Sequence, residues 1–194
     1  MPKPRTAKDR EQHLYIGLDD WHSGYSIRKV SCSRSRGSGK RAEPLPGAFM
    51  RIRAPRGFPE WIAAAFGTKI MVLYPGIADD TPGIPMIDVE EQSFDYGPEP
   101  EPHYNASPIY LPVGDNKLFA LCFATFHCYL WMPEHSEPWG RKDLSFPPFG
   151  RVDVSSYGVQ PDGCILVSTK RGTTFIFDTK EYVWKQYSNW PGTL

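Results

Sequence analysis

The stretch PIYLPVGDNKLFALC at residues 108–122 decides the fold, because two apolar segments flank a short turn. The stretches WIAAAFGTKIMVLY at 61–74 and SSYGVQPDGCILVS at 155–168 have the same form. Two apolar segments joined by a turn of Gly, Asp or Asn residues are typical of a β-hairpin. The three turns are separated by two equal intervals of 47 residues, which predicts an internal repeat; they begin at Gly67, Gly114 and Pro161.

A second hairpin follows in each repeat. It is clearest in TFIFDTKEYVWKQY at 174–187, where aromatic and polar residues alternate and Asp178 provides turn chemistry. The stretch IPMIDVEEQSFDYG at 84–97 matches it, with Asp88 equivalent to Asp178 and Phe94 equivalent to Trp184. The middle copy, ATFHCYLW, is shorter and lacks the aspartate turn. LYIGLDDWHSGYSIRKV at 14–30 has the pattern of an outer hairpin without its inner one.

Four short strands in each unit of about 47 residues are the signature of a β-propeller blade. We therefore predict an all-β fold, a partial β-propeller of about three and a half kelch-like four-stranded blades. Residues 59–67 also fit a short helix that begins after Pro59 and ends at Gly67, but the repeat favours a strand there. The inner strands are expected to carry Ile70, Val72, Leu118, Ala120, Ile165 and Val167.

Composition agrees with this fold class. The 194 residues include 17 Gly, 20 Pro and 14% aromatic residues, which favours short strands between many turns, and 40% hydrophobic content can build one core. We predict a disordered basic N-terminus at 1–13 and a single propeller domain at 14–194. Within that domain, 31–47 is expected to be a flexible basic loop and 88–102 an extended acidic loop.

The formal net charge of zero hides an asymmetry, because residues 1–56 carry +8 and the remainder −8. The basic excess peaks in SCSRSRGSGKR at 31–41. The default interpretation is a solvated loop between blades; the alternative is a site that binds nucleic acid, an importin or an acidic partner. Without interleaved aromatic residues we expect no specific nucleic-acid site. The candidate binding residues are Arg34, Arg36, Lys40 and Arg41.

No catalytic, metal or cofactor residue is predicted. The five histidines and four cysteines lack metal-ligand spacing, and GSGK at 37–40 departs from the phosphate-binding pattern. His127 and Cys128 are adjacent in a predicted strand, so their side chains should point to opposite faces. The paired carboxylates Asp79-Asp80 and Glu90-Glu91 lie in turn-like sequence. We expect Cys122, Cys128 and Cys164 to pack in the core.

The N-terminus lacks the apolar core of a signal peptide, and the longest apolar run, 118–132, is too short to cross a membrane. These features predict an intracellular protein, cytoplasmic or nuclear, without a membrane partner. FPPF at 146–149 is interpreted as a connector that packs its aromatic residues, or as a ligand for a proline-recognising groove.

The segments AAFGTKIMVLYP, PIYLPVGDNKLFAL and FPPFGRVDVSSYGVQPDGCILVSTKRGTTFIFDTKEYVWKQYSNW resemble the lineage-expanded kelch-like proteins of grasses. These are plant domains of unknown function that are similar to the propellers that follow F-boxes. The resemblance covers most of the chain from about Leu14. It implies a propeller fold and no particular activity.

The leading hypothesis for function is therefore a non-enzymatic protein-interaction module with an unknown protein partner. The alternatives are a substrate-recognition partner in ubiquitin ligase assembly and a small-molecule enzyme that uses the propeller channel. Three and a half blades leave sheet edges exposed. We therefore expect a truncated gene product, marginal stability, or closure by a partner or a second copy, with self-association through the open blade edges.

Overall fold

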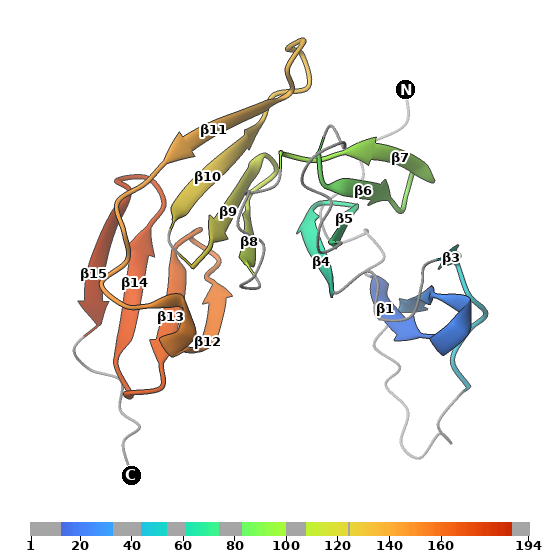
Figure 1. Cartoon of the computed structure of the whole chain (residues 1–194), viewed down its shortest axis with the longest axis horizontal. Helices are drawn as coiled ribbons and strands as arrows, with labels where there is room; N and C mark the ends of the chain where they lie inside the picture. Colours follow the sequence, from blue (N-terminus) through green and yellow to red (C-terminus); the bar gives the residue numbers. More distant parts are fainter. Residues whose placement is uncertain are drawn as a thin grey trace, which may run out of the picture. The chain divides into compact units, whose positions relative to one another are not determined.

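The computed structural model describes residues 13–32, 44–53, 61–73, 83–99, 108–123 and 125–187, in which the regular elements are β-strands and two short 3-10 turns (Figure 1). The chain divides into two compact units, Met1–Glu60 and Trp61–Leu194. The described residues contain no helix that is long and apolar enough to span a membrane.

The first unit contains a three-stranded antiparallel sheet in the order β1-β2-β3. The predicted hairpin at 14–30 is confirmed as β1 (His13–Asp19) and β2 (Tyr25–Ser31), joined through η2 (Trp21–Ser23). The expectation of a half blade was wrong by one strand, because β3 (Met50–Ile52) pairs with β2. Three residues following a polar loop are too few to show a strand pattern in the sequence.

The second unit contains three four-stranded antiparallel sheets, each with its strands in chain order. The first blade is β4 (Trp61–Phe66), β5 (Lys69–Leu73), β6 (Pro85–Asp88) and β7 (Ser93–Tyr96). The second is β8 (Ile109–Val113), β9 (Lys117–Leu121), β10 (Phe126–Trp131) and β11 (Trp139–Asp143). The third, preceded by η3 (Arg151–Asp153), is β12 (Val154–Val159), β13 (Ile165–Thr169), β14 (Thr174–Asp178) and β15 (Val183–Tyr187).

Glycine closes the first hairpin of every blade. Gly67, Gly114 and Gly163 have φ values of 54°, 63° and 89°, a left-handed conformation that costs glycine little. The predicted turns are therefore confirmed, and so is the strand at Trp61–Phe66 in place of the alternative helix.

The second hairpins of the first and third blades use the same aspartate turn. Oδ1 of Asp88 and Oδ1 of Asp178 each accept the backbone N–H groups two and three residues further on, at 2.9 to 3.1 Å. The residue four positions after the aspartate, Gln92 or Tyr182, is left-handed, with φ of 54° or 57°. The predicted equivalence of Asp88 and Asp178 is confirmed.

One expectation about the second hairpins was confirmed and one was wrong. The middle repeat has the fourth strand that a four-stranded blade requires, β11, which follows a longer loop after Trp131. The segment 88–102, expected to be an extended acidic loop, contains the aspartate turn and strand β7 within its described residues. Strand β7 belongs to the hairpin predicted at 84–97, so the hairpin match was right and the loop assignment was wrong.

The three blades stack through apolar side chains that alternate along the second strands. Leu118 and Ala120 belong to a core cluster with residues of the first blade, and Phe119 and Leu121 belong to a cluster with residues of the third blade. The first strands are in contact, β4 with β8 and β8 with β12. Three stacked four-stranded blades confirm the partial β-propeller.

The six residues expected on the inner strands are all buried, at most 9% exposed. They lie, however, on the second strand of each blade, β5, β9 or β13, whereas β4, β8 and β12 are innermost. Hairpin periodicity shows which residues are apolar but not which of the two strands lies nearer the axis.

Candidate interaction site on the first blade

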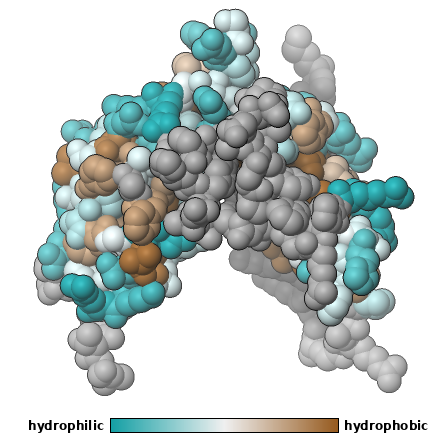
Figure 2. All heavy atoms as spheres, viewed as in Figure 1, coloured by the Kyte–Doolittle hydropathy of each residue, from teal (hydrophilic) through white to brown (hydrophobic). Residues whose placement is uncertain are grey.

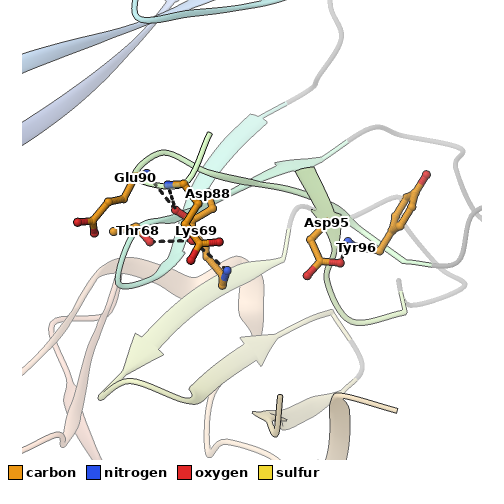
Figure 3. A network of polar contacts seen from close by, with 7 residues as sticks. Thr68, Lys69, Asp88, Glu90, Asp95 and Tyr96 are labelled. Carbon is orange, nitrogen blue, oxygen red and sulfur yellow. Dashed lines mark hydrogen bonds and ion pairs between the residues drawn. The ribbon is translucent and has the colours of Figure 1, made fainter. Parts of the chain in front are cut away.

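Asp88, the last residue of β6, organises one end of strand β7. Its Oδ1 accepts the N–H groups of Glu90 and Glu91 at 2.9 and 3.1 Å, and its Oδ2 accepts Thr68 Oγ1 at 2.9 Å and Lys69 Nζ at 3.1 Å (Figure 3). Burial raises the pKa of this carboxyl, but the Glu91 N–H, Lys69, the Glu90 N–H and Thr68 outweigh burial and lower the pKa from 3.8 to about 2. The carboxylate is 7% exposed. The turn before β7 is therefore held by a buried charge.

Strand β7 is the outermost strand of the first blade, and all four of its residues are exposed. Phe94 and Tyr96 lie on one face of the strand, 61% and 39% exposed, with ring centroids 5.3 Å apart and an interplanar angle of 84°. Such an edge-to-face pair is favourable in itself, yet most of the Phe94 ring remains open to solvent. β7 therefore presents a preformed aromatic surface.

The second blade holds the other end of β7. The indole Nε1 of Trp139 donates to the backbone oxygen of Tyr96 at 3.2 Å, and the hydroxyl of Tyr129 donates to the backbone oxygen of Glu99 at 3.2 Å. The N–H of Tyr96 donates to Oδ1 of Asp95 at 2.8 Å (Figure 3). Strand β7 is therefore anchored at both ends, which fixes its exposed side chains in place.

The chain segment that contains β7 carries charge of one sign. Between Lys69 and Lys117 the sequence contains nine Asp and Glu residues and no Lys or Arg. Four carboxylates, those of Glu90, Glu91, Asp95 and Glu99, lie at exposed positions within residues 83–99. No ion pair joins any of them to a cation within the described part of the chain. We name Phe94, Tyr96 and these four carboxylates the β7 surface.

The other blades place different residues at the position of Phe94. Trp184 of β15 pairs with Phe177 as Phe94 pairs with Ile87, which confirms their predicted equivalence. Trp184 packs in the second core cluster, with its ring centroid 4.8 Å from that of Phe177. Arg141 of β11 is exposed at the corresponding place.

The predicted binding residues Arg34, Arg36, Lys40 and Arg41 lie outside the described residues, as does the Asp79-Asp80 pair. The Glu90-Glu91 pair is exposed in a turn, as expected. In the described ranges, no group of three or more His, Cys, Asp or Glu residues is placed to hold a metal ion.

His127 on β10 is fully buried, with its ring centroid 4.7 Å from that of Tyr129. Burial first, and then the positive charge of Arg141, lower the pKa of His127 to about 4, against the opposing effect of Asp143. Cys128 lies in the second core cluster, on the other face of the strand, where burial raises the thiol pKa to about 11. The prediction that these two side chains point to opposite faces is confirmed.

The expectation for the other cysteines holds in part. Cys122 is buried in the first core cluster, but Cys164 is only half-buried in the turn before β13. The N–H of Cys164 donates to Oδ1 of Asp162 at 2.9 Å. The placement of Cys164 in the core was wrong, because the turn pulls this residue out of the strand.

In the connector at 146–149, one aromatic residue is packed and the other is exposed. Phe149 packs against Phe175 and Trp184, with centroid distances of 5.1 Å to each, as predicted for a connector. Phe146 is 71% exposed.

The β7 surface was not predicted from the sequence, because the acidic composition of 88–102 favours a solvated loop and the hairpin match at 84–97 aligns Phe94 with Trp184 without showing that its ring is exposed. One signal was present: Phe94 and Tyr96 alternate with Ser93 and Asp95, the pattern of a strand with one aromatic face. That signal predicts the strand but not the exposure of its rings.

Three stacked blades, each a four-stranded antiparallel meander, make this chain a partial β-propeller protein. The chain belongs to the family described as "Protein of unknown function (DUF1668)", whose profile matches residues 11–191. A search of curated proteins found no match.

Proposed function

We propose that this protein is a non-enzymatic protein-interaction module that binds its partner through the β7 surface. The supporting observation is that two aromatic rings on an outermost strand are exposed while the strand itself is anchored by Asp88, Trp139 and Tyr129. Rigid presentation reduces the entropy lost on binding, and exposed aromatic residues are common anchors of protein interfaces.

The described titratable groups support a role without catalysis. The histidine with the strongest pKa change, His127, is enclosed by core residues, and Asp88 is committed to an ion pair with Lys69. A catalytic acid or base has to reach a substrate. Neither group does so, and the carboxylates of the β7 surface are exposed.

The third blade offers a weaker surface for self-association. On its face directed away from the second blade, Leu166 and Ile176 are only partly buried, and Ser168 shares a 2.9 Å hydroxyl hydrogen bond with Thr174. Figure 2 shows hydrophobic and hydrophilic side chains intermingled over this blade. Self-association through open blade edges therefore stays a secondary proposal, which light scattering tests: a concentration-dependent rise in mass supports it.

The resemblance to kelch-like proteins of grasses supports a plant origin and an intracellular role in the cytoplasm or nucleus. In that setting our second candidate is substrate recognition within a ubiquitin ligase assembly. Co-purification with a ligase scaffold supports it, and affinity purification that lacks every ligase component argues against it. Binding through Arg34, Arg36, Lys40 and Arg41 is a separate proposal, and unchanged nuclear accumulation of the Ser variants would remove it.

The main proposal is tested by proximity labelling in the source cells. Three forms of the full chain carry the labelling enzyme: the wild type, Phe94→Ser with Tyr96→Ser, and the matched control Val183→Ser with Tyr187→Ser on β15, whose residues are also exposed. We expect the β7 variant alone to lose a set of labelled proteins. If both variants label the same proteins as the wild type, the β7 surface is not the interaction site.

A further inference from the structure

We propose that the partner of the β7 surface is an arginine- or lysine-rich peptide segment, recognised by cation–π contact with Phe94 and Tyr96 and by attraction to the surrounding carboxylates. This inference rests on the proposed function and adds the chemistry of the partner. It is carried by three features of β7 and its flanking residues: two exposed rings, four exposed carboxylates and a backbone that is anchored at both ends.

Within the described part of the chain, the rings of Phe94 and Tyr96 have no cation over them. Other aromatic rings of the chain already have cations over them: Lys142 Nζ lies 3.7 Å from the ring centroid of Tyr182, and Lys69 Nζ lies 5.8 Å from that of Trp131. Among the described residues no Lys or Arg occupies this position over Phe94 or Tyr96. The rings therefore remain available to a cation from a partner.

The exposed carboxylates favour a partner segment with positive charge. Asp88 is neutralised by Lys69, whereas Glu90, Glu91, Asp95 and Glu99 are exposed, and the sequence contains no Lys or Arg between 70 and 116. A negative surface attracts cationic segments and repels acidic ones. An aromatic pair within such a surface favours a side chain that is both cationic and able to stack, which describes arginine best and lysine next.

The backbone of β7 indicates how the segment binds. Both backbone groups of Tyr96 are already used, because its N–H donates to Asp95 and its oxygen accepts from Trp139. A partner strand hydrogen-bonded along the whole of β7 would have to break these bonds. Recognition therefore proceeds through side chains rather than through addition of a fifth strand to the blade.

The experiment uses the purified full chain and fluorescein-labelled peptides of alternating Arg-Ser, Lys-Ser and Glu-Ser, measured by fluorescence polarisation. We expect binding of the Arg and Lys peptides, with the Arg peptide tighter, and none of the Glu peptide. Binding should weaken when salt rises from about 20 mM to about 150 mM, because the screening length shortens as the salt concentration rises. Phe94→Ser and Tyr96→Ser should each weaken binding about two- to five-fold, the value of an exposed cation–π contact.

Asp95→Asn should weaken binding and flatten its salt dependence. The control, Val183→Ser with Tyr187→Ser on β15, should leave binding unchanged. Binding that is insensitive to Phe94→Ser and Tyr96→Ser overturns the inference, as does failure of the Arg peptide to bind at low salt. If that failure accompanies loss of labelled proteins from the β7 variant in cells, the cationic partner is wrong while the interaction module stands.

Thermal melting separates recognition from packing. Phe94→Ser should leave the melting temperature nearly unchanged, whereas Trp184→Ala, at the equivalent but packed position, should lower it strongly. A drop for Phe94→Ser as large as that for Trp184→Ala means that Phe94 is a core residue, which also overturns the inference.

Discussion

Replacement of Asp88 by Asn should destabilise the protein far more than the same change at Asp178. Both aspartates make the same turn, but Asp88 also binds Thr68 and Lys69 in a buried setting. The pKa of Asp88 falls from 3.8 to about 2 on folding, a difference of nearly two pH units. At 1.36 kcal/mol for each unit, the ionised carboxylate contributes about 2 kcal/mol at neutral pH.

The pH dependence has a definite sign. Because the folded-state pKa of Asp88 lies below the unfolded value, its contribution is present above pH 3.8 and is lost as the pH falls toward 2. Asp88→Asn lacks this contribution at every pH. Wild type and variant should therefore differ most at neutral pH and converge near pH 2.

Urea unfolding followed by tryptophan fluorescence measures the difference, together with thermal melting, in which about 2 kcal/mol corresponds to roughly 4–8 °C for a chain of this size. Asp178→Asn is the matched control, since its carboxylate is more exposed and Lys185 Nζ is 3.7 Å away. Equal losses for the two variants, or a difference between wild type and Asp88→Asn that persists at pH 2, would refute the assignment of a buried ion pair to Asp88.

Three further predictions follow from the core and the turns. The folded-state pKa of His127 is about 4 and the ordinary value is 6.5, so the unfolded chain takes up a proton first as the pH falls. Urea titrations should therefore show that the free energy of unfolding drops by about 3 kcal/mol between pH 6.5 and 4. The same drop in His127→Gln would contradict this prediction. Phe177→Ala should cost about 3–5 kcal/mol because the ring is fully buried, while Phe146→Ala should stay within about 0.5 kcal/mol by the same measurement. Gly114→Ala should cost about 1 kcal/mol through its φ of 63° alone, since no atom lies within 4 Å of the added carbon, whereas Gly158→Ala, with equal space and no positive φ, should be neutral or stabilising.

The blade architecture could be predicted because its determinants are local. A left-handed glycine or an aspartate turn fixes a hairpin within a few residues, and equal spacing then identifies the repeat. Asp88 and Asp178 are an example: their equivalence was predicted from the sequence, and the structure shows that they make the same hydrogen bonds in the turn.

The features that sequence could not give depend on neighbours distant in the chain. Strand β11 follows a longer loop and carries Arg141, Lys142 and Asp143, so it has no apolar alternation of its own; it forms because β10 offers an edge for pairing. Phe94 and Trp184 are equally aromatic at the same place in their repeats. Only the three-dimensional structure shows that one ring is exposed and the other is covered by Phe126 and Phe149.

This contrast separates stability from recognition within one blade. Asp88 stabilises the turn before β7 and Trp139 binds the other end of the strand, so these two residues fix the position of β7. Phe94, in contrast, contributes little to the core and presents its ring to solvent. If the separation is real, Asp88→Asn should weaken both stability and binding of the Arg-Ser peptide, because a loosened strand loses its fixed geometry. Phe94→Ser should weaken binding alone. A pair of variants with the opposite pattern would mean that the exposed ring supports the fold and that the anchored turn does not serve the interaction.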